Sequence, residues 1–257
     1  MELNFYKYQG TGNDFILIDS RENSFLFKKL CDRHFGVGAD GIILIQNDDE
    51  DDRSDFYMKY CNSDGQESTM CGNGGRCAIS FAANKLGINK IHFRAVDGYH
   101  DGFIIDNLVS INMLNVNKKE IEIHSKYVFL NTGSPHHVQF VEKENIKEKD
   151  VYKEGKKIRC QKTYWEKGVN VNFVKILENN TLQVRTYERG VENETLSCGT
   201  GVIASVIAAC ETNKIEKILV QTLGGKLWVS LTKTKNEYKN IYLTGNVKFI
   251  FKGYILI

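Results

Sequence analysis

Two cysteines stand in glycine-rich turns, and each turn leads directly into an apolar stretch that is typical of a helix. The first turn is "CGNG", Cys71 to Gly74, and the second is "CGTG", Cys198 to Gly201. The start of a helix presents unpaired N–H groups and the positive end of the helix dipole. A thiol held there loses its proton more easily, and the same N–H groups can bind a carboxylate or phosphate. Each turn therefore predicts a reactive sulfur beside an anion site.

The two turns belong to a faint repeat of the whole chain. "TGND" at 11–14 is echoed by "TGSP" at 132–135, and Asn62 precedes the first cysteine by the same interval as Arg189 precedes the second. Short motifs seldom keep their order and spacing by chance, so an internal duplication is the economical explanation. Two equivalent thiols, one in each domain, would then face each other across an interdomain cleft.

Opposed thiols suit the inversion of a carbon that bears hydrogen. One thiolate removes the proton from one face, and the thiol opposite delivers another proton to the second face. A carbanion beside a carboxylate needs hydrogen-bond donors aimed at the developing charge, which the two helix starts can supply. The alternative of another class is a non-enzymatic module that binds a small ligand or anion at the two helix starts.

Other motifs predict less. "GVGADG" at 36–41 fits a dinucleotide-binding pattern, but a strand-like run follows it where a helix is required. Cys71 and Cys77 lack a common zinc spacing and have no second cysteine pair, so no metal site is predicted. The acidic run at 48–55 and the lysine- and glutamate-rich run at 142–157 are interpreted as solvated loops or faces.

Length and composition restrict the class of protein. The chain has 257 residues and a formal net charge of +2, so it carries no broad basic field for nucleic acid. No apolar run is long enough to cross a bilayer, and no secretory signal is visible at the N-terminus. The seven cysteines are an odd number, which favours reduced thiols and a cytoplasmic protein.

Short β-rich runs separated by turn signals make up most of the chain. They are expected at 15–19, 41–46, 55–61, 91–96 and 108–113, and again at 127–131, 136–141, 169–177, 181–188 and 227–231. The two stretches after Cys71 and Cys198 are apolar on nearly every side, which predicts buried helices.

These elements predict an α/β fold of the α+β type. We expect two pseudo-symmetric domains, each a curved mixed β-sheet or barrel wrapped around a central buried helix, with the active site in the interdomain cleft. The N-terminal domain is expected to span 1–114, with 246–257 returning to it. The C-terminal domain is expected to span 115–245.

The assembled motifs resemble those of the diaminopimelate epimerase family, enzymes that interconvert LL- and meso-diaminopimelate without pyridoxal phosphate. The matching stretches are "GTGNDF" (10–15), "DRHFGVGADG" (32–41), "CNSDGQESTMCGNGGRC" (61–77), "GSPHHV" (133–138), "NVNFV" (170–174) and "YERGVENETLSCGTG" (187–201). The resemblance implies an amino-acid substrate, no cofactor, a homodimer, and a product that feeds lysine and peptidoglycan synthesis.

The resemblance also implies roles for single residues. It makes Cys71 and Cys198 the acid–base pair, with His136 and Glu188 placed near the thiols to tune proton transfer and grip an ammonium. The substrate-binding residues it implies are Asn13, Asn62, Gly72, Asn73, Asn170, Glu188, Arg189, Gly199 and Thr200. Arg189 would pair with a carboxylate, whereas Asn13 and Asn62 could instead serve turns alone.

Three departures from the family pattern bear on substrate choice. Ser134 stands where asparagine is common, Gly41 where some members carry glutamine, and the loop at 190–195 is one residue longer than the commoner form. Proline racemase relatives share the two-thiol logic but typically have histidine where this chain has Asn73, and the phenazine-biosynthesis isomerases lack the paired thiols. The alternative within the class is therefore an epimerase or racemase for another amino acid, such as proline or hydroxyproline.

Overall fold

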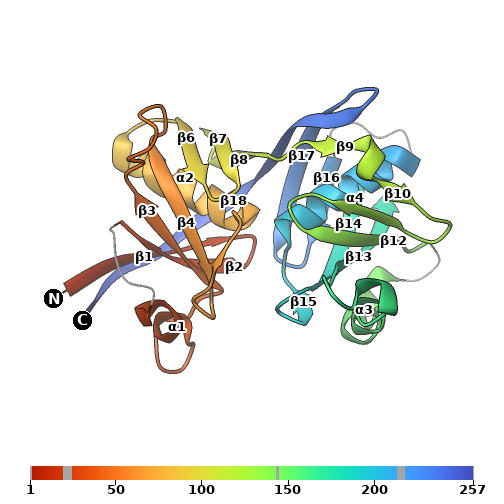
Figure 1. The fold of residues 1–257 in the computed structure, drawn as a ribbon, viewed down its shortest axis with the longest axis horizontal. Helices are drawn as coiled ribbons and strands as arrows, with labels where there is room; N and C mark the ends of the chain where they lie inside the picture. Colours follow the sequence, from red (N-terminus) through yellow and green to blue (C-terminus); the bar gives the residue numbers. More distant parts are fainter. Residues whose placement is uncertain (1, 20–24, 143–144, 213–217, 257) are drawn as a thin grey trace. The chain divides into compact units, whose positions relative to one another are not determined.

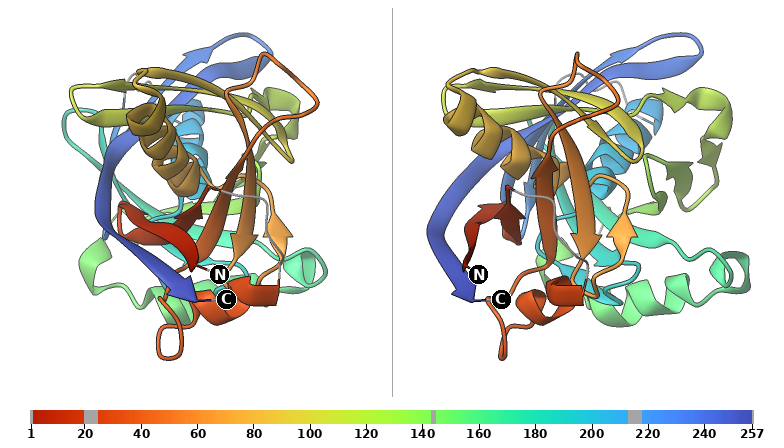
Figure 2. Two further views of the ribbon diagram at one scale, coloured as in Figure 1. Left: turned by 90° about the vertical axis from the view of Figure 1, so that its left-hand side faces the viewer. Right: turned by 60° about the vertical axis from the view of Figure 1, so that its left-hand side comes forward.

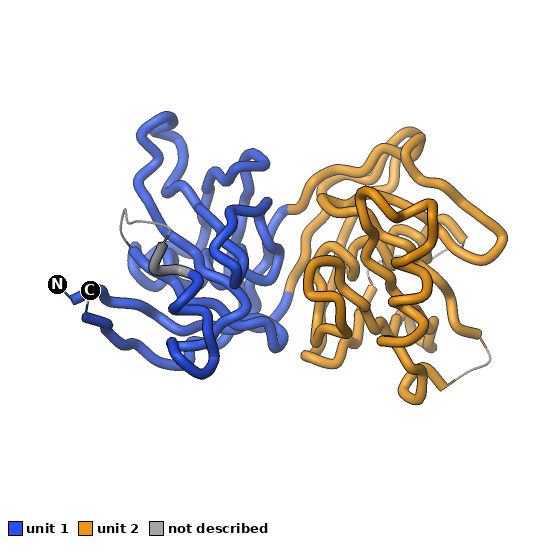
Figure 3. The backbone as a smooth tube through the Cα atoms, turned by 60° about the horizontal axis from the view of Figure 1, so that its bottom comes forward, with its two compact units in different colours: residues 1–112, 245–257 blue, residues 113–244 orange. Residues whose placement is uncertain are grey.

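The structure is a computed structural model of the chain, and it describes residues 2–19, 25–142, 145–212 and 218–256. The chain divides into two compact units (Figure 3). Unit 1 is Met1–Asn112 with Gly245–Ile257, and unit 2 is Met113–Thr244.

The strands of unit 1 close into a ring around its long helix (Figures 1 and 2). The pairing order is β1, β2, β3, β4, β6, β7, β8 and β18, and β18 pairs with β1 again. The strands of this unit that precede β18 are β1 (Glu2–Gly10), β2 (Asn13–Ile18), β3 (Gly41–Gln46), β4 (Phe56–Asn62), β5 (Glu67–Ser68), β6 (Lys90–Ala95), β7 (Gly98–Ile105) and β8 (Leu108–Met113).

Unit 2 repeats the same series of pairings. β11, β12, β13, β14, β16 and β17 follow one another as β1, β2, β3, β4, β6 and β7 do, with the same parallel and antiparallel steps. The bounds are β9 (Val116–Asn117), β10 (Glu122–Ile123), β11 (Val128–Asn131), β12 (Pro135–Phe140), β13 (Asn170–Leu177), β14 (Thr181–Glu188), β15 (Asn193–Thr195), β16 (Ile218–Thr222), β17 (Gly225–Lys233) and β18 (Glu237–Leu256). Two units built on one plan confirm the predicted pseudo-symmetric fold.

Each parallel step needs a crossover connection, and the α-helices form these crossovers. α2 (Gly72–Leu86) joins β4 to β6, and α4 (Gly199–Thr212) joins β14 to β16. α2 packs against β1, β2, β3, β6 and β7, and α4 packs against β11, β12, β13, β14 and β17. A helix surrounded in this way must be apolar on nearly every side, as both were predicted to be. Gly87, in the left-handed conformation at φ 71°, ends α2.

Two shorter helices cover the outer faces of the strands. α1 (Phe25–Cys31) connects β2 to β3, and α3 (Val151–Arg159) connects β12 to β13. Under them lie two apolar clusters, one including Leu30 and Ile42 and the other including Val151 and Phe173. β3 and β13 are therefore buried on both faces, which explains their nearly continuous apolar sequences. Three short 3-10 segments complete unit 2: Lys118–Glu120, Ile146–Glu148 and Lys162–Tyr164.

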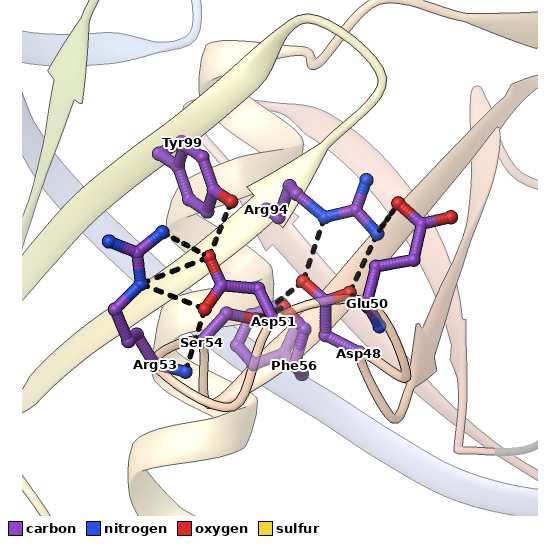
Figure 4. Close-up of polar contacts among 8 residues, drawn as sticks. All are labelled: Asp48, Glu50, Asp51, Arg53, Ser54, Phe56, Arg94 and Tyr99. Carbon is purple, nitrogen blue, oxygen red and sulfur yellow. Dashed lines mark hydrogen bonds and ion pairs between the residues drawn. The ribbon is translucent and has the colours of Figure 1, made fainter.

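The acidic run at 48–55 forms the β3–β4 loop, but its carboxylates are not all solvated (Figure 4). The side chain of Asp48 is fully buried and accepts hydrogen bonds from Nε and Nη2 of Arg94, at 2.8 and 2.6 Å. Asp51 accepts from the backbone N–H and the guanidinium of Arg53 and from the Tyr99 hydroxyl. The interpretation of the run as solvated was wrong for these two carboxylates, because Arg94 and Tyr99 come from β6 and β7 and fasten the loop to them.

A prediction on stability concerns the contact between Gly102 of β7 and Ile79 of α2. A Cβ added at Gly102 would overlap Cδ1 of Ile79 and lie 2.7 Å from its Cγ1. Because Ile79 is fully buried, Gly102→Ala should lower the free energy of unfolding by about 1–3 kcal/mol in urea titrations. The double variant Gly102→Ala/Ile79→Ala should cost less than the sum of the two single changes, and strictly additive costs would contradict this packing.

Candidate functional site

Cys71 is the N-cap of α2. Its carbonyl accepts the first helical hydrogen bond, from the N–H of Gly75 at 2.6 Å, and its side chain makes no capping bond. The thiol instead donates to Oδ1 of Asn13 at 3.7 Å. Cys198 takes the same place at α4, where its carbonyl accepts from the N–H of Val202 at 2.9 Å. Each cysteine thus stands where the unpaired N–H groups of its helix begin, as predicted.

In unit 1, two predicted residues contact the sulfur or one another. Oδ1 of Asn13 also accepts from Nδ2 of Asn73 at 3.3 Å, and Nδ2 of Asn13 donates to Asp40 at 2.6 Å. Asp40 also forms an ion pair with Arg33, whose Nη2 lies 2.7 Å from Oδ1 of Asp40. The amide of Asn13 is therefore oriented, with its oxygen toward Cys71 and Asn73 and its nitrogen toward the Asp40 carboxylate.

Gly72 and Asn62 lie at the same end of the strands of unit 1. Gly72 is the first residue of α2, and Asn62 ends β4 and pairs with Gly41 at the start of β3. A Cβ at Gly41 would lie 2.6 Å from Cε2 of Tyr60. Tyr60 therefore occupies the space that a side chain at position 41 would need. This packing explains why the chain has glycine where some family members carry glutamine.

In unit 2, Cys198, Thr200 and His136 form a chain of polar contacts. The Cys198 sulfur is 3.5 Å from Oγ1 of Thr200, which is 3.0 Å from Nε2 of His136. Nδ1 of His136 is 3.0 Å from Nδ2 of Asn172, whose Oδ1 accepts from the Thr186 hydroxyl. Because the amide nitrogen can only donate, the proton of neutral His136 lies on Nε2 and is donated to Thr200.

His136 stays neutral because burial lowers its pKa to about 3, with a further contribution from the positive charge of Arg189. Its side chain lies under the start of α4: a Cβ at Gly201 would overlap Oδ1 of Asn172 and lie 3.3 Å from Cε1 of His136. Gly199 is the first residue of α4. The histidine therefore acts here as a neutral hydrogen-bond donor beneath the helix N-terminus.

The remaining predicted residues gather where β13 starts and β14 ends. Asn170 is paired with His136 across the parallel β12–β13 step, and its Oδ1 accepts from the N–H of Arg189 at 2.8 Å. Arg189 donates from Nη1 to the carbonyl of Lys167 at 2.7 Å, and Glu188 accepts from the Thr195 hydroxyl at 2.8 Å. Ser134, which departs from the family pattern, lies in the β11–β12 turn.

Besides Asp40, Lys167 and Thr195, four more residues bonded to the predicted set were missed by the sequence analysis. Thr11 donates to Asn73 in unit 1, and Arg76 donates to both of them. In unit 2, Thr132 donates to the carbonyl of Thr200, and Asn172 holds His136. A polar residue inside an otherwise apolar run, as in "RCAISFAA" for Arg76 and "NVNFV" for Asn172, is the signal that could have found two of them.

Neither a metal cluster nor a membrane-spanning helix is found among the described residues. No group of three or more His, Cys, Asp or Glu side chains is arranged to hold an ion there. None of the helices described is long and apolar enough to cross a bilayer.

Comparison with known proteins decides the family. The sequence profile for diaminopimelate epimerase matches residues 5–99 and 128–250. The diaminopimelate epimerase of Flavobacterium psychrophilum is 51% identical over 97% of this chain and 99% of its own length. That of Aquifex aeolicus is 39% identical over 98% and 97%. This chain belongs to the diaminopimelate epimerase family.

Solved structures of lower identity share the fold. A hydroxyproline epimerase from Agrobacterium vitis superposes with a TM-score of 0.73 at 12% identity, covering 99% of this chain and 92% of its own. A phenazine biosynthesis protein from Bacillus anthracis superposes with a TM-score of 0.72 at 14% identity, covering 100% of both chains. The resemblance to the diaminopimelate epimerase family is confirmed, and the wider fold is shared with other activities.

A prediction on pH concerns the buried histidines of β12. Burial lowers the pKa of His137 to about 4, against 6.5 for an ordinary histidine. Between these values the unfolded chain binds a proton that the folded chain does not, so stability should fall as the pH is lowered from about 6.5 to about 4, by roughly 3 kcal/mol for this group. Urea titrations at stepped pH should show this decline in the wild type and a shallower one in His137→Gln. Equally steep declines in the wild type and in His137→Gln would contradict the assignment of the lowered pKa to His137.

Proposed function

We propose that this chain interconverts LL-2,6-diaminopimelate and meso-diaminopimelate by moving the proton at one α-carbon. The support is membership of the diaminopimelate epimerase family over nearly the whole chain, including a relative of that name at 51% identity. The reaction needs no change of oxidation state and no group transfer, since one C–H bond is broken and another is formed at the same carbon.

Cys71 and Cys198 carry the reaction in this proposal. One sulfur, as thiolate, takes the α-proton, and the other, as thiol, delivers its proton to the opposite face, which inverts the carbon. After turnover the two sulfurs have exchanged protonation states, so the same pair serves the reverse direction. The observation that supports the pair most is their equivalence: each is the residue at which the buried helix of its unit starts.

The helix starts also suit the intermediate. Removal of the α-proton leaves negative charge that spreads toward the neighbouring carboxylate, and N–H groups at a helix start stabilise such charge without reorganising. Gly72 and Asn73 in unit 1, and Gly199 and Thr200 in unit 2, would supply these donors. No cofactor is required for this step in the proposed mechanism.

The remaining residues bind the rest of the substrate in this proposal. The guanidinium of Arg189 pairs with a carboxylate and Glu188 with an ammonium, as charge requires. Asn13, Asn62 and Asn170 add neutral hydrogen bonds. Support for these roles is their position at or directly after the ends of β2, β4, β13 and β14, together with the contact of Asn13 with the Cys71 sulfur.

The assembly and location belong to the same proposal. We expect a cytoplasmic homodimer whose product is used in lysine and peptidoglycan synthesis. Support for association comes from apolar side chains that β18 leaves exposed in unit 1: Phe249, Ile250, Phe251, Tyr254 and Leu256 are each at least 44% accessible. Support for a reducing compartment comes from the absence of disulfides among the seven described cysteines.

The test is incubation of the protein with LL-diaminopimelate followed by chiral separation. The wild type should produce the meso isomer, and Cys71→Ala and Cys198→Ala should each be at least about 100-fold slower, since each removes one proton-transfer group. Cys160→Ala is the matched control, because Cys160 is exposed and should leave the rate unchanged. Near wild-type turnover in either active-site variant would refute the mechanism. Inversion of proline or hydroxyproline at a higher rate would instead favour the alternative substrate.

A further inference from the structure

Arg76 is a charged residue in the middle of an apolar core. It lies in the first turns of α2 and is fully buried, with no exposed side-chain surface. Its Nη2 donates to Oγ1 of Thr11 and to Oδ1 of Asn73, both at 3.0 Å. Its Nε and Nη1 atoms are buried and have no hydrogen-bond partner among the described residues. Among the described residues, the guanidinium is thus hydrogen-bonded through Nη2 alone.

This placement is unfavourable in two ways. A buried cation normally sits against a carboxylate, and within the described part of the chain Arg76 forms no ion pair. The N-terminal turns of a helix also disfavour positive charge. Burial lowers the pKa of Arg76 to about 10, which still leaves the guanidinium charged at neutral pH. A charge retained at such a site indicates a function that uses it.

Two thiols are the groups whose negative charge would act on this cation: Cys71 and Cys77. Cys77 is fully buried, and burial raises the pKa of its thiol far above the ordinary value, so it stays neutral. Cys71 is only partly buried at the helix start. It is also linked to Arg76 through hydrogen bonds, since Asn73 accepts from Arg76 and donates to the Asn13 oxygen that Cys71 contacts.

Other titratable groups on the strands around α2 are satisfied elsewhere. Tyr8 of β1 bonds Asn84, and burial raises its pKa. Asp14 of β2 is paired with Lys7 and Arg33. Asp97 accepts from the N–H of Met70 and contacts His100 of β7. The residues of β3 carry no titratable group, and the charged residues of β6 alternate onto its more exposed face.

We propose that Arg76 is a positioning residue that favours the thiolate of Cys71 and aligns the Asn73 amide beside it. The inference rests on the proposed acid–base role of Cys71. Oδ1 of Asn13 accepts a hydrogen bond from the Cys71 thiol and so favours the neutral form. The buried cation opposes this preference, which lets the sulfur give up its proton to solvent near neutral pH and then, as thiolate, take one from substrate.

Unit 1 has a buried arginine at this helix position, and unit 2 does not. Counting from the cysteine of each turn, the position of Arg76 in α2 corresponds to Ile203 in α4, an apolar residue that is 1% exposed. Substitution of Arg76 should therefore affect Cys71 and leave Cys198 as an internal reference. Ile203→Met is a matched control, since it changes core packing at the equivalent position without changing charge.

The experiment measures alkylation of each cysteine by iodoacetamide as a function of pH, read by peptide mass spectrometry. The thiolate sulfur attacks the reagent and iodide leaves, so the rate follows ionisation. Arg76→Gln and Arg76→Met should each move the Cys71 midpoint up by about one pH unit, which slows its alkylation about tenfold at pH 7. The Cys198 midpoint should not move. Arg76→Lys should restore most of the effect, and Ile203→Met should shift neither cysteine.

An unchanged Cys71 midpoint in either neutral variant, with a native circular dichroism spectrum, would overturn the proposal. If neither neutral variant folds, the wild type decides. A Cys71 midpoint below that of Cys198, which stands at the same kind of helix start with Ile203 in place of the arginine, supports the proposal, and one at or above it refutes it. The measurement uses no amino-acid substrate, so it can succeed or fail independently of the activity proposed above. For a folded neutral variant, a lower kcat with a nearly unchanged KM is expected.

Discussion

The enclosure of one helix by the strands of each unit is the constraint on which the remaining structure depends. Since strands surround α2 and α4, nearly every side of each helix must be apolar, and polar chemistry is confined to the helix ends. At the N-terminal end the unpaired N–H groups must still be satisfied. A cysteine at that position gains the electrostatic environment of the helix start without placing a polar side chain in the core.

The two units use one framework with different polar interiors. In unit 1 the helix glycine Gly74 faces Phe15 and Ile43, and in unit 2 the equivalent Gly201 faces His136 and Asn172. Because this pair is apolar in unit 1, the polar contacts near Cys71 are made by Asn13, Asn73 and the buried Arg76 cation. The polar pair in unit 2 supplies a neutral donor, because burial keeps His136 uncharged. The same backbone arrangement therefore surrounds the two thiols with different chemistry.

Sequence reasoning located the elements whose residues are buried on both faces. The strand predicted at 41–46 is β3, Gly41–Gln46, and both buried helices follow their cysteines as expected. β1 and β7 were missed, because some of their buried positions are held by polar residues or glycine, such as Lys7 in β1 and His100 and Gly102 in β7. The short α1 and α3 were also missed; in α3 only Val151 and Gly155 are buried.

The predicted site residues could be named from motifs, but their hydrogen-bond partners could not. Asp48 looked like one of many acidic loop residues, and only the pairing of β4 with β6 shows that Arg94 is available to bury it. Arg76 was assigned no role from the sequence. The closed ring of strands encloses its side chain, and this ring is formed by residues far away in the sequence.

The claim that two groups of this chain act on opposite faces of one carbon is tested most directly by isotope incorporation. LL-diaminopimelate should be converted in heavy water and sampled at early times, with deuterium at the α-carbon measured separately in product and in recovered substrate. Two thiols predict that the product carries solvent deuterium while the substrate carries almost none, because the group that takes the proton does not return it. Equal deuterium in both isomers from the start would indicate a single base and contradict the account.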